Sequence, residues 1–222
     1  MWYTITMNPI AKRTISALTA AALVALAVIC APVSWMRPVF AVLIALAFVE
    51  LCLLLKRKLG GLRLVFGAII GLAVLCLLGA LPAIAVGHGN LMMLYVIAII
   101  KVSDMGGFAA GVSTAKLMTG GNHKMCPTIS PNKSWEGLAG SVAASCILSC
   151  SFIPVTGFIW WKALVFGVTA ALVGTFGDLV ESKFKRWVGV KDSSTFMPAG
   201  MGGLLDMLDS LLFVPVILLP FV

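Results

Sequence analysis

Hydrophobic residues run through most of this chain in stretches long enough to cross a membrane. Seven stretches can be distinguished, at residues 15–35, 38–55, 62–86, 91–115, 137–154, 158–180 and 204–221. A membrane helix needs about 20 residues to cross the hydrocarbon, so the second and seventh stretches are short. The pattern predicts an all-α fold, a polytopic transmembrane helical bundle of about seven spans.

Composition supports a membrane protein. Hydrophobic residues make up 61% of the 222 residues and charged residues 11%, and the mean hydropathy is +1.09. A soluble domain carries about 25% charged residues, and nothing here resembles a soluble domain that would bind nucleic acid. Without an internal repeat, residues 1–222 are expected to form one domain. Residues 1–100 supply mainly N-terminal helices, and residues 101–222 supply catalytic helices and cytoplasmic loops.

The basic residues predict the orientation. If the N-terminus lies inside, Arg37 and Lys162 fall outside and thirteen basic residues fall inside: Lys12, Arg13, Lys56, Arg57, Lys58, Arg63, Lys116, Lys124, Lys133, Lys183, Lys185, Arg186 and Lys191. This is a strong positive-inside bias, and such a face attracts anionic lipid and phosphorylated substrates. The first stretch could be a signal peptide. We expect it to be retained, because removing it would break the inside/outside alternation.

Polar and small residues are sparse in the first half. Glu50 is its one acid, and it is either a buried polar contact or an interfacial residue beside the basic run that starts at Lys56. Gly67 and Gly71 form a G-x-x-x-G pair that would let two helices approach closely. The six cysteines show neither a C-x-x-C pair nor metal-ligand spacing, so we expect them to pack as small hydrophobic residues.

Acidic residues are concentrated near the C-terminus. The chain has eight carboxylates, and five of them are Asp178, Glu181, Asp192, Asp206 and Asp209. Two pairs are spaced i, i+3, so on helices each pair shares one face. Acidic side chains are costly in a bilayer and usually functional. Their mixture with lysine and arginine predicts a site for a metal ion and phosphates.

A helix that continues past Asp178 would place Asp178, Glu181, Ser182 and Lys185 on one stripe. Mg²⁺ is usually held by one or two carboxylates together with substrate phosphates, and Asp178, Asp206 and Asp209 could supply such oxygens. The alternative for the latter two is purely structural, because acids in the first turn of a helix favour its dipole.

Glycines and cations fit the same hypothesis. Gly200, Gly202 and Gly203 precede the last stretch, where backbone N–H groups at a helix N-terminus could bind phosphate, although a glycine-rich link is often only a turn. The cations Lys185, Arg186 and Lys191 could neutralise a triphosphate. Basic residues are also expected there simply because the loop lies at the inner membrane face.

An earlier loop carries a second polar block, S-P-N-K-S-W-E-G, at residues 130–137. Ser134 is a candidate helix N-cap with Gly137 in the position that a capping box gives to an acid. Glu136 is one residue short of that position and needs another role. Upstream, Asp104 follows Lys101 by three residues, either as a buried ion pair or as part of a polar cavity.

Together the two blocks resemble the phosphatidate cytidylyltransferases, or CDP-diacylglycerol synthases, a family of polytopic enzymes that use CTP. The family's closing motif, S-x-x-K-R-x4-K-D followed by a glycine turn and L-D-R-x-D-S, is matched by Ser182, Lys185, Arg186, Lys191, Asp192, Gly202, Gly203, Leu205, Asp206, Asp209 and Ser210. The earlier motif, D-x-G-A-Y-x-x-G followed by S-P-K-K-[ST]-W-E-G, is matched by Asp104, Gly106, Phe108, Gly111, Ser130, Pro131, Lys133, Ser134, Trp135, Glu136 and Gly137. The resemblance covers residues 104–212.

Four positions depart from the family pattern. Met201 replaces a histidine, Met207 replaces an arginine, Asn132 replaces a lysine, and Ala199 looks like an insertion. The carboxylates predicted to bind metal are all present.

The resemblance implies a Mg²⁺-dependent nucleotidyltransferase of phospholipid biosynthesis that converts CTP and phosphatidate to CDP-diacylglycerol and pyrophosphate. It implies that Asp178, Asp206 and Asp209 hold Mg²⁺ and act in catalysis with Lys185 and Asp192. Substrate and phosphate contacts are expected from Ser130, Lys133, Glu136, Ser182, Arg186, Lys191, Gly202, Gly203, Asp104 and Glu181. The resemblance leaves a second cation and a homodimer open, and it suggests a bacterial inner membrane with the active site on the cytoplasmic side.

Three other hypotheses stay open. The enzyme could act on another lipid phosphate, such as an isoprenoid-ether lipid or a polyprenyl phosphate. Met201 and Met207 would suit a non-catalytic partner subunit. A carrier could use Asp104 and Asp178 within the membrane, although transporters often show repeated halves and none is visible.

Overall fold

The computed structural model describes residues 25–118, 121–190 and 203–222. Its helical elements are η1 (Val33–Trp35), α2 (Met36–Lys56), α3 (Gly61–Leu75), η2 (Cys76–Gly79), α4 (Ala80–His88), α5 (Asn90–Leu117), α6 (Trp135–Ser151), α7 (Ile153–Thr156), α8 (Trp160–Val188), α9 (Leu204–Leu208), α10 (Val214–Leu218) and η3 (Leu219–Phe221). One antiparallel hairpin pairs β1 (Lys124–Cys126) with β2 (Ser130–Ser134). Apart from this hairpin, the expected helical fold is confirmed.

Among the described residues, four helical runs are long and apolar enough to cross a membrane: Val33–Lys56, Gly61–His88, Asn90–Leu117 and Trp160–Val188. They correspond to the second, third, fourth and sixth stretches expected from the sequence. Helices of this length and hydropathy make the chain an integral membrane protein. Residues 15–24 of the first expected stretch lie outside the described residues.

The fifth and seventh stretches do not form single long helices. Helix α6 has 17 residues and gives way to α7, which carries Pro154 near its start and ends at Gly157 with a φ of 68°. The C-terminal stretch divides into α9, a turn over residues 209–213, and α10. Pro215 lacks the N–H that a continuous helix would need there. The expectation of one helix over 204–221 is therefore wrong.

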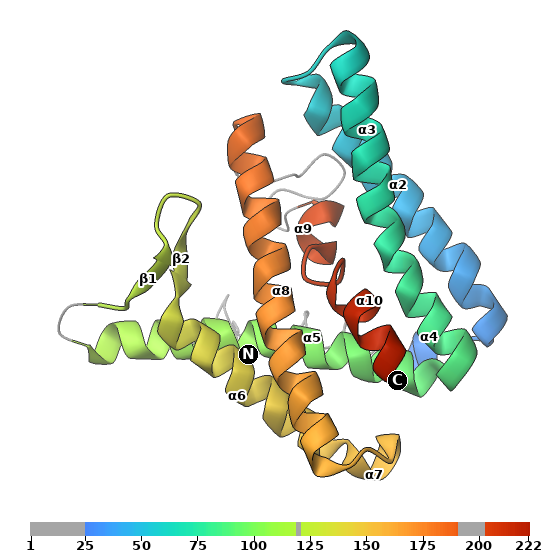
Figure 1. Cartoon of the computed structure of the whole chain (residues 1–222), viewed down its shortest axis with the longest axis vertical. Helices are drawn as coiled ribbons and strands as arrows, with labels where there is room; N and C mark the ends of the chain where they lie inside the picture. Colours follow the sequence, from blue (N-terminus) through green and yellow to red (C-terminus); the bar gives the residue numbers. More distant parts are fainter. Residues whose placement is uncertain (1–24, 119–120, 191–202) are drawn as a thin grey trace, which may run out of the picture.

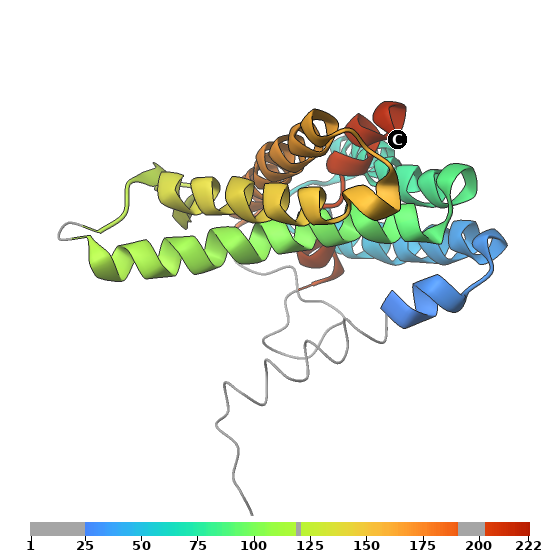
Figure 2. The same ribbon diagram turned by 90° about the horizontal axis from the view of Figure 1, so that it is seen from below.

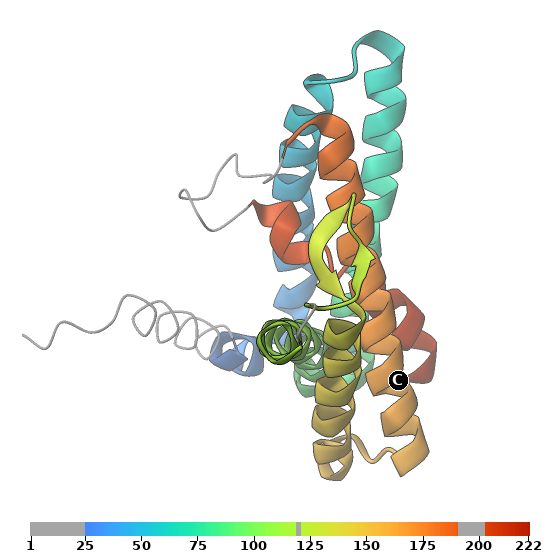
Figure 3. The ribbon, with the colours of Figure 1, turned by 90° about the vertical axis from the view of Figure 1, so that its left-hand side faces the viewer.

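The long helices cross at steep angles instead of forming a parallel bundle. Helix α5 runs across α8 in Figure 1 and is seen nearly end-on in Figure 3, where α8 stands upright. Helices α5 and α6 pack side by side along their lengths (Figure 2). Helices α2 and α3 form a separate pair, and α9 and α10 lie between this pair and α8 (Figure 1).

Small residues allow α5 and α6 to touch backbone to backbone. A Cβ atom on Gly106 would lie 2.8 Å from the carbonyl oxygen of Gly140 and would also meet the side chain of Ala144. The same holds in reverse, since a Cβ on Gly140 would lie 2.8 Å from the oxygen of Gly106. Close approach of this kind is common between membrane helices. It brings the polar residues of α5 next to the start of α6.

Serines connect α6 to α8. Ser145 Oγ donates to the carbonyl oxygen of Gly167 at 2.8 Å, and Ser149 Oγ donates to that of Ala163 at 2.7 Å. The hydroxyl of buried Tyr95 on α5 lies 2.6 Å from Ser149 Oγ. These bonds fix the region in which α5, α6 and α8 cross.

Candidate functional site

The polar residues of α8 form two clusters, about a turn apart. The first, the Asp178 cluster, starts with an ion pair between Lys133 Nζ and Asp178 Oδ2 at 2.6 Å. Lys133 also donates to the carbonyl oxygen of Thr175 at 3.2 Å. Lys133 lies on β2, so its bonds dock the hairpin against α8, as the arrangement in Figure 1 indicates.

Helix α5 brings a second acid to the Asp178 cluster. Ser210 Oγ donates to Asp104 Oδ2 at 3.1 Å. Lys101 Nζ lies 3.6 Å from the same oxygen and donates to Ser210 Oγ at 3.0 Å and to the carbonyl oxygen of Met207 at 3.2 Å. Asp104 is thus an ion-pair partner and, as described below, also lines a cavity. The predicted ion pair exists but is partly exposed, with side chains 42% and 34% accessible, and a role of Asp104 in an active cavity stays a prediction.

Asp209 completes the Asp178 cluster. It is assigned to this cluster because its backbone packs against Gly177, the residue before Asp178 on α8. Gly177 makes the approach possible, because a Cβ atom there would lie 2.6 Å from the carbonyl oxygen of Asp209. The backbone N–H of Ser210 donates to Asp209 Oδ1 at 2.6 Å and orients the carboxylate.

The second group, the Lys185 cluster, joins α8 to α9. Lys185 Nζ lies 2.7 Å from Glu181 Oε2 and 3.0 Å from Asp206 Oδ1. These side chains are only 14%, 10% and 16% exposed, so solvent screens them less than a surface ion pair. Asp206 Oδ2 also accepts from the N–H of Gly203 at 2.9 Å. Asp206 therefore caps α9 and belongs to the charged cluster at once.

The three predicted metal ligands are not gathered at one point. Asp178 and Asp209 share a cluster, whereas Asp206 pairs with Lys185. Within the part of the chain that the structure describes, no group of three His, Cys, Asp or Glu side chains could hold a metal ion. The geometry therefore does not support a preformed metal site made of Asp178, Asp206 and Asp209.

Unpaired carboxylate oxygens nevertheless fit a cation. Asp178 Oδ1 and Glu181 Oε1 are buried and have no hydrogen-bond partner among the described residues. Buried acceptors are normally satisfied, and Mg²⁺ often reaches a protein bound to phosphates, needing only one or two carboxylates. The donor set therefore suits a cation that is carried in by a phosphorylated substrate.

Two cavities flank α8. A polar cavity of about 260 Å³ is lined by Asp104, Ser130, Lys133, Ser141, Thr175 and Asp178. An apolar groove of about 320 Å³ lies between the α2–α3 pair and α8, and Glu181 is its one acid; its lining includes Leu51, Leu55, Gly67, Gly71, Phe184 and Leu212. Gly67 and Gly71 pack directly against leucine side chains of α2, since a Cβ on Gly71 would overlap with Leu51 Cδ2. A charged site and an apolar groove thus share one helix.

The hairpin is held at its base by Glu136. Ser134 Oγ accepts from the N–H of Gly137 at 3.1 Å, which confirms the predicted cap of α6. Glu136 Oε1 accepts from the N–H of His123 at 3.1 Å and lies 2.6 Å from its Nδ1. These hydrogen bonds from His123 lower the pKa of Glu136 to about 2, so it stays ionised at physiological pH. His123 carries no signal in the sequence.

The remaining predicted residues are placed as follows. Arg186 is exposed, and its Nε lies 3.5 Å from the carbonyl oxygen of Ile129 at the hairpin tip. Ser182 is partly buried on α8, and Gly203 is the buried N-cap of α9. Lys191, Asp192 and Gly202, together with the departures at 199 and 201, lie outside the described residues.

Sequence patterns did not indicate that Glu50 lies near this region. It is fully buried on α2, and its Oε2 accepts from the N–H of Leu205 at 3.0 Å, next to Asp206. The first of its two predicted roles, a buried polar contact, is confirmed. Its partner is 155 positions away in the chain, so local spacing contains no trace of the contact.

The fold and the two charged clusters define an integral membrane protein with a carboxylate- and lysine-lined site. The cytidylyltransferase family model matches residues 4–222, and the chain belongs to this family. The sequence resemblance is thereby confirmed.

Curated relatives agree with this assignment. The phosphatidate cytidylyltransferase of Mycobacterium bovis is 44% identical over 124 residues, which are 54% of this chain and 36% of that protein. The Haemophilus influenzae protein of the same name is 37% identical over 135 residues, 56% of this chain and 43% of the relative. The Staphylococcus aureus protein is 42% identical over 124 residues, 55% and 45% of the two chains. The chain thus covers less than half the length of these relatives.

Proposed function

We propose that this protein transfers the cytidylyl group of CTP to phosphatidate and releases CDP-diacylglycerol and pyrophosphate. The observation that carries the proposal is the face of α8 on which Asp178 and Glu181 keep unpaired oxygens beside Lys133 and Lys185. Such a face can hold a cation that, together with the two lysines, would neutralise and orient several phosphates. The family and the names of the relatives agree with this chemistry.

The reaction needs charge neutralisation more than a protein nucleophile. A phosphate oxygen of phosphatidate attacks the α-phosphorus of CTP, and the bond from that phosphorus to the bridging oxygen breaks, with its electron pair leaving on pyrophosphate. Catalysis of such displacements rests on positioning and electrostatic stabilisation. Lys133 and Lys185 are already held in place by acids. Arg186, and Lys191 outside the described residues, are proposed to bind the triphosphate as well.

The carboxylates are assigned two roles, metal binding and positioning of the lysines. Asp178 and Asp209 are best placed to hold Mg²⁺, because both belong to the Asp178 cluster. Asp206, the third predicted ligand, would first have to release Lys185. When bound, Mg²⁺ supplies positive charge to the phosphates. Glu181 and Asp104 orient the lysines, and Asp192 is proposed to do the same for the basic residues of its loop.

The apolar groove is suited to the acyl chains of the lipid. It lies on the side of α8 that carries Glu181, so a phosphate near Lys185 would leave the tails free to enter the groove. Trp187 lines the groove, and Lys58 Nζ lies 5.3 Å from the centre of its ring, which puts a cation at this end. The lipid would therefore enter sideways from the bilayer.

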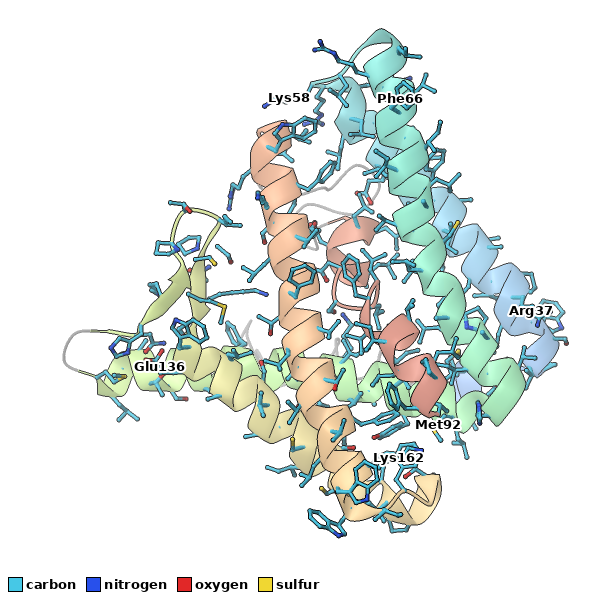
Figure 4. All side chains as sticks on the ribbon, in the orientation of Figure 1. Arg37, Lys58, Phe66, Met92, Glu136 and Lys162 are labelled. Carbon is cyan, nitrogen blue, oxygen red and sulfur yellow. The ribbon has the colours of Figure 1, made fainter. Side chains whose placement is uncertain are left out.

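The seven-span topology with the N-terminus inside is part of the proposal. In Figure 4, Lys58 lies near the top of the molecule, whereas Arg37 lies at its right and Lys162 near its bottom. This separation agrees with the positive-inside pattern. It supports a site that opens to the cytoplasmic side of a bacterial inner membrane. Homodimerisation stays a prediction.

Pyrophosphate release tests the function directly. Purified full-length protein in detergent is incubated with CTP and phosphatidate, with and without Mg²⁺. We expect release that requires both substrates and Mg²⁺, and product with the mass of CDP-diacylglycerol. Diacylglycerol, which lacks the phosphate, serves as the control, and a polyprenyl phosphate tests the alternative substrate. A folded protein that releases no pyrophosphate with phosphatidate contradicts the proposal.

A further inference from the structure

Glu50 is a fully buried acid within a helix long enough to cross the membrane. An ionisable side chain is costly there and is usually retained because of a function. Its Oε2 accepts from the N–H of Leu205, whereas its Oε1 has no hydrogen-bond partner among the described residues. Within the part of the chain that the structure describes, the side chain of Glu50 is hydrogen-bonded to the first turn of α9 and to no other element.

Helix α9 depends on such contacts for its position. It has only five residues, and helices of that length have little stability of their own. The first N–H groups of any helix also lack acceptors within it. At the start of α9, acidic side chains accept from two of these N–H groups: Asp206 accepts from the N–H of Gly203, and Glu50 accepts from that of Leu205.

A second contact holds the other end of α9. Lys101 of α5 donates to the carbonyl oxygen of Met207. Helix α9 is therefore attached to α2 near its start and to α5 near its end. Asp206, which pairs with Lys185, lies between these two attachments. Asp209, which belongs to the Asp178 cluster, lies two residues after the second one.

We propose that Glu50 is a positioning residue of the active site. Its carboxylate fixes the start of α9 against α2, so that Asp206 reaches Lys185 and Asp209 reaches the Asp178 cluster. A role of this contact in catalysis rests on the proposed function. The hydrogen bond from Leu205 to Glu50 does not depend on it. The N-terminal helices of the chain thereby take part in forming a site whose acids all lie after residue 100.

The test compares Glu50→Met with Glu50→Gln. Met has a similar volume and removes the buried carboxyl group that accepts from Leu205, and such replacements often leave overall stability intact. Gln keeps an oxygen that can accept from Leu205. Phe40→Ala is the matched control, because Phe40 is buried on α2 ten residues earlier, about 15 Å along the helix.

Hydrogen–deuterium exchange of the full-length protein in detergent gives a readout that does not depend on activity. In Glu50→Met we expect peptides covering residues 203–210 to exchange about tenfold faster. In Glu50→Gln and Phe40→Ala the same peptides should exchange as in the wild type. Unchanged exchange of this segment in Glu50→Met overturns the proposal, and so does an increase that extends equally over α5 and α8.

Kinetics provide the second readout. Glu50→Met should lower kcat for cytidylyl transfer at least about tenfold with a smaller change in KM for CTP, because misplaced acids weaken transition-state stabilisation more than binding. Glu50→Gln should restore most of kcat. Faster exchange of residues 203–210 with kcat unchanged contradicts the catalytic meaning of the contact. If wild type itself releases no pyrophosphate while the exchange result holds, only the proposed function fails.

Discussion

The two lysines at the centre of the candidate site are already paired with acids in the structure. Lys133 is bound to Asp178, and Lys185 is shared between Glu181 and Asp206. Sequence spacing correctly placed Glu181 and Lys185 on one stripe, because both lie on the same helix. The pairing of Lys133 with Asp178 spans 45 positions and could not be derived from spacing. At this scale the sequence identified the participants, and the tertiary structure chose the partners.

Lys133 is expected to be essential for transfer. Lys133→Gln removes the cation that β2 presents to Asp178 and to the polar cavity. We expect the rate of pyrophosphate release to fall on the order of 100-fold, the scale of losing one preorganised electrostatic contact. Lys124→Gln is the control, because Lys124 lies on the partner strand and is exposed. Similar rates for both variants would count against the assignment.

Asp206→Asn separates the two roles of Asp206. The amide oxygen can still accept from the N–H of Gly203, so the cap of α9 is retained. The negative charge that meets Lys185 is lost. We expect Mg²⁺-dependent transfer to be abolished while the thermal unfolding temperature changes little. Turnover close to that of the wild type would refute a catalytic or metal-binding role.

At the scale of elements, the site depends on how closely the C-terminal segment approaches α8. Gly177 leaves room for the backbone of Asp209, and the turn after α9 exists because the stretch does not continue as one helix. Hydropathy alone predicted a continuous helix there. Pro215 is the residue in the sequence that argues against a continuous helix, because proline cannot donate the hydrogen bond that a helix interior requires.

The two glycines of α8 near the site should respond differently to alanine. In Gly177→Ala the new methyl group would lie 2.6 Å from the carbonyl oxygen of Asp209, so the segment must move. In Gly174→Ala the nearest atoms lie 3.9 and 4.0 Å away, which is ordinary contact. We expect a loss of at least about tenfold in kcat for the first variant, as misplaced groups commonly produce.

Gly174→Ala should keep activity within about twofold and could raise the unfolding temperature, because alanine favours the helix by about 1 kcal/mol relative to glycine. Both variants are compared by pyrophosphate release and by thermal unfolding in the same detergent. Equal activity of the two would show that the approach of Asp209 to α8 is not required.

At the scale of the whole molecule, charge and hydropathy predict which helix ends share a side of the membrane. Helix α2 has 21 residues, about 30 Å at 1.5 Å per residue, and separates Arg37 from the basic run that starts at Lys56. Steep crossing of α5 and α8 was not foreseen (Figures 1 and 3). It brings the middle of each helix, where Asp104 and Asp178 lie, to one place.

Cysteine labelling tests the orientation. In a protein whose six cysteines are replaced by alanine, Arg37→Cys and Lys124→Cys introduce single thiols at exposed positions. A membrane-impermeant maleimide should label the first in intact spheroplasts and the second only after permeabilisation, because basic loops stay inside. Labelling of Lys124→Cys in intact spheroplasts would contradict the predicted orientation.

The sequence by itself determined that this is a helical membrane protein, and it predicted that two polar blocks carry its chemistry. Hydropathy, charge bias and short motifs are local properties, and a single chain is enough to display them. Only the tertiary structure decided that Glu50 holds α9, that Lys133 meets Asp178, and that Asp206 stands with Lys185 apart from the Asp178 cluster. Those contacts depend on where helices cross and on how closely their backbones approach. Glycine and proline positions in the sequence permit such crossings and close approaches, but they do not specify which helices make them.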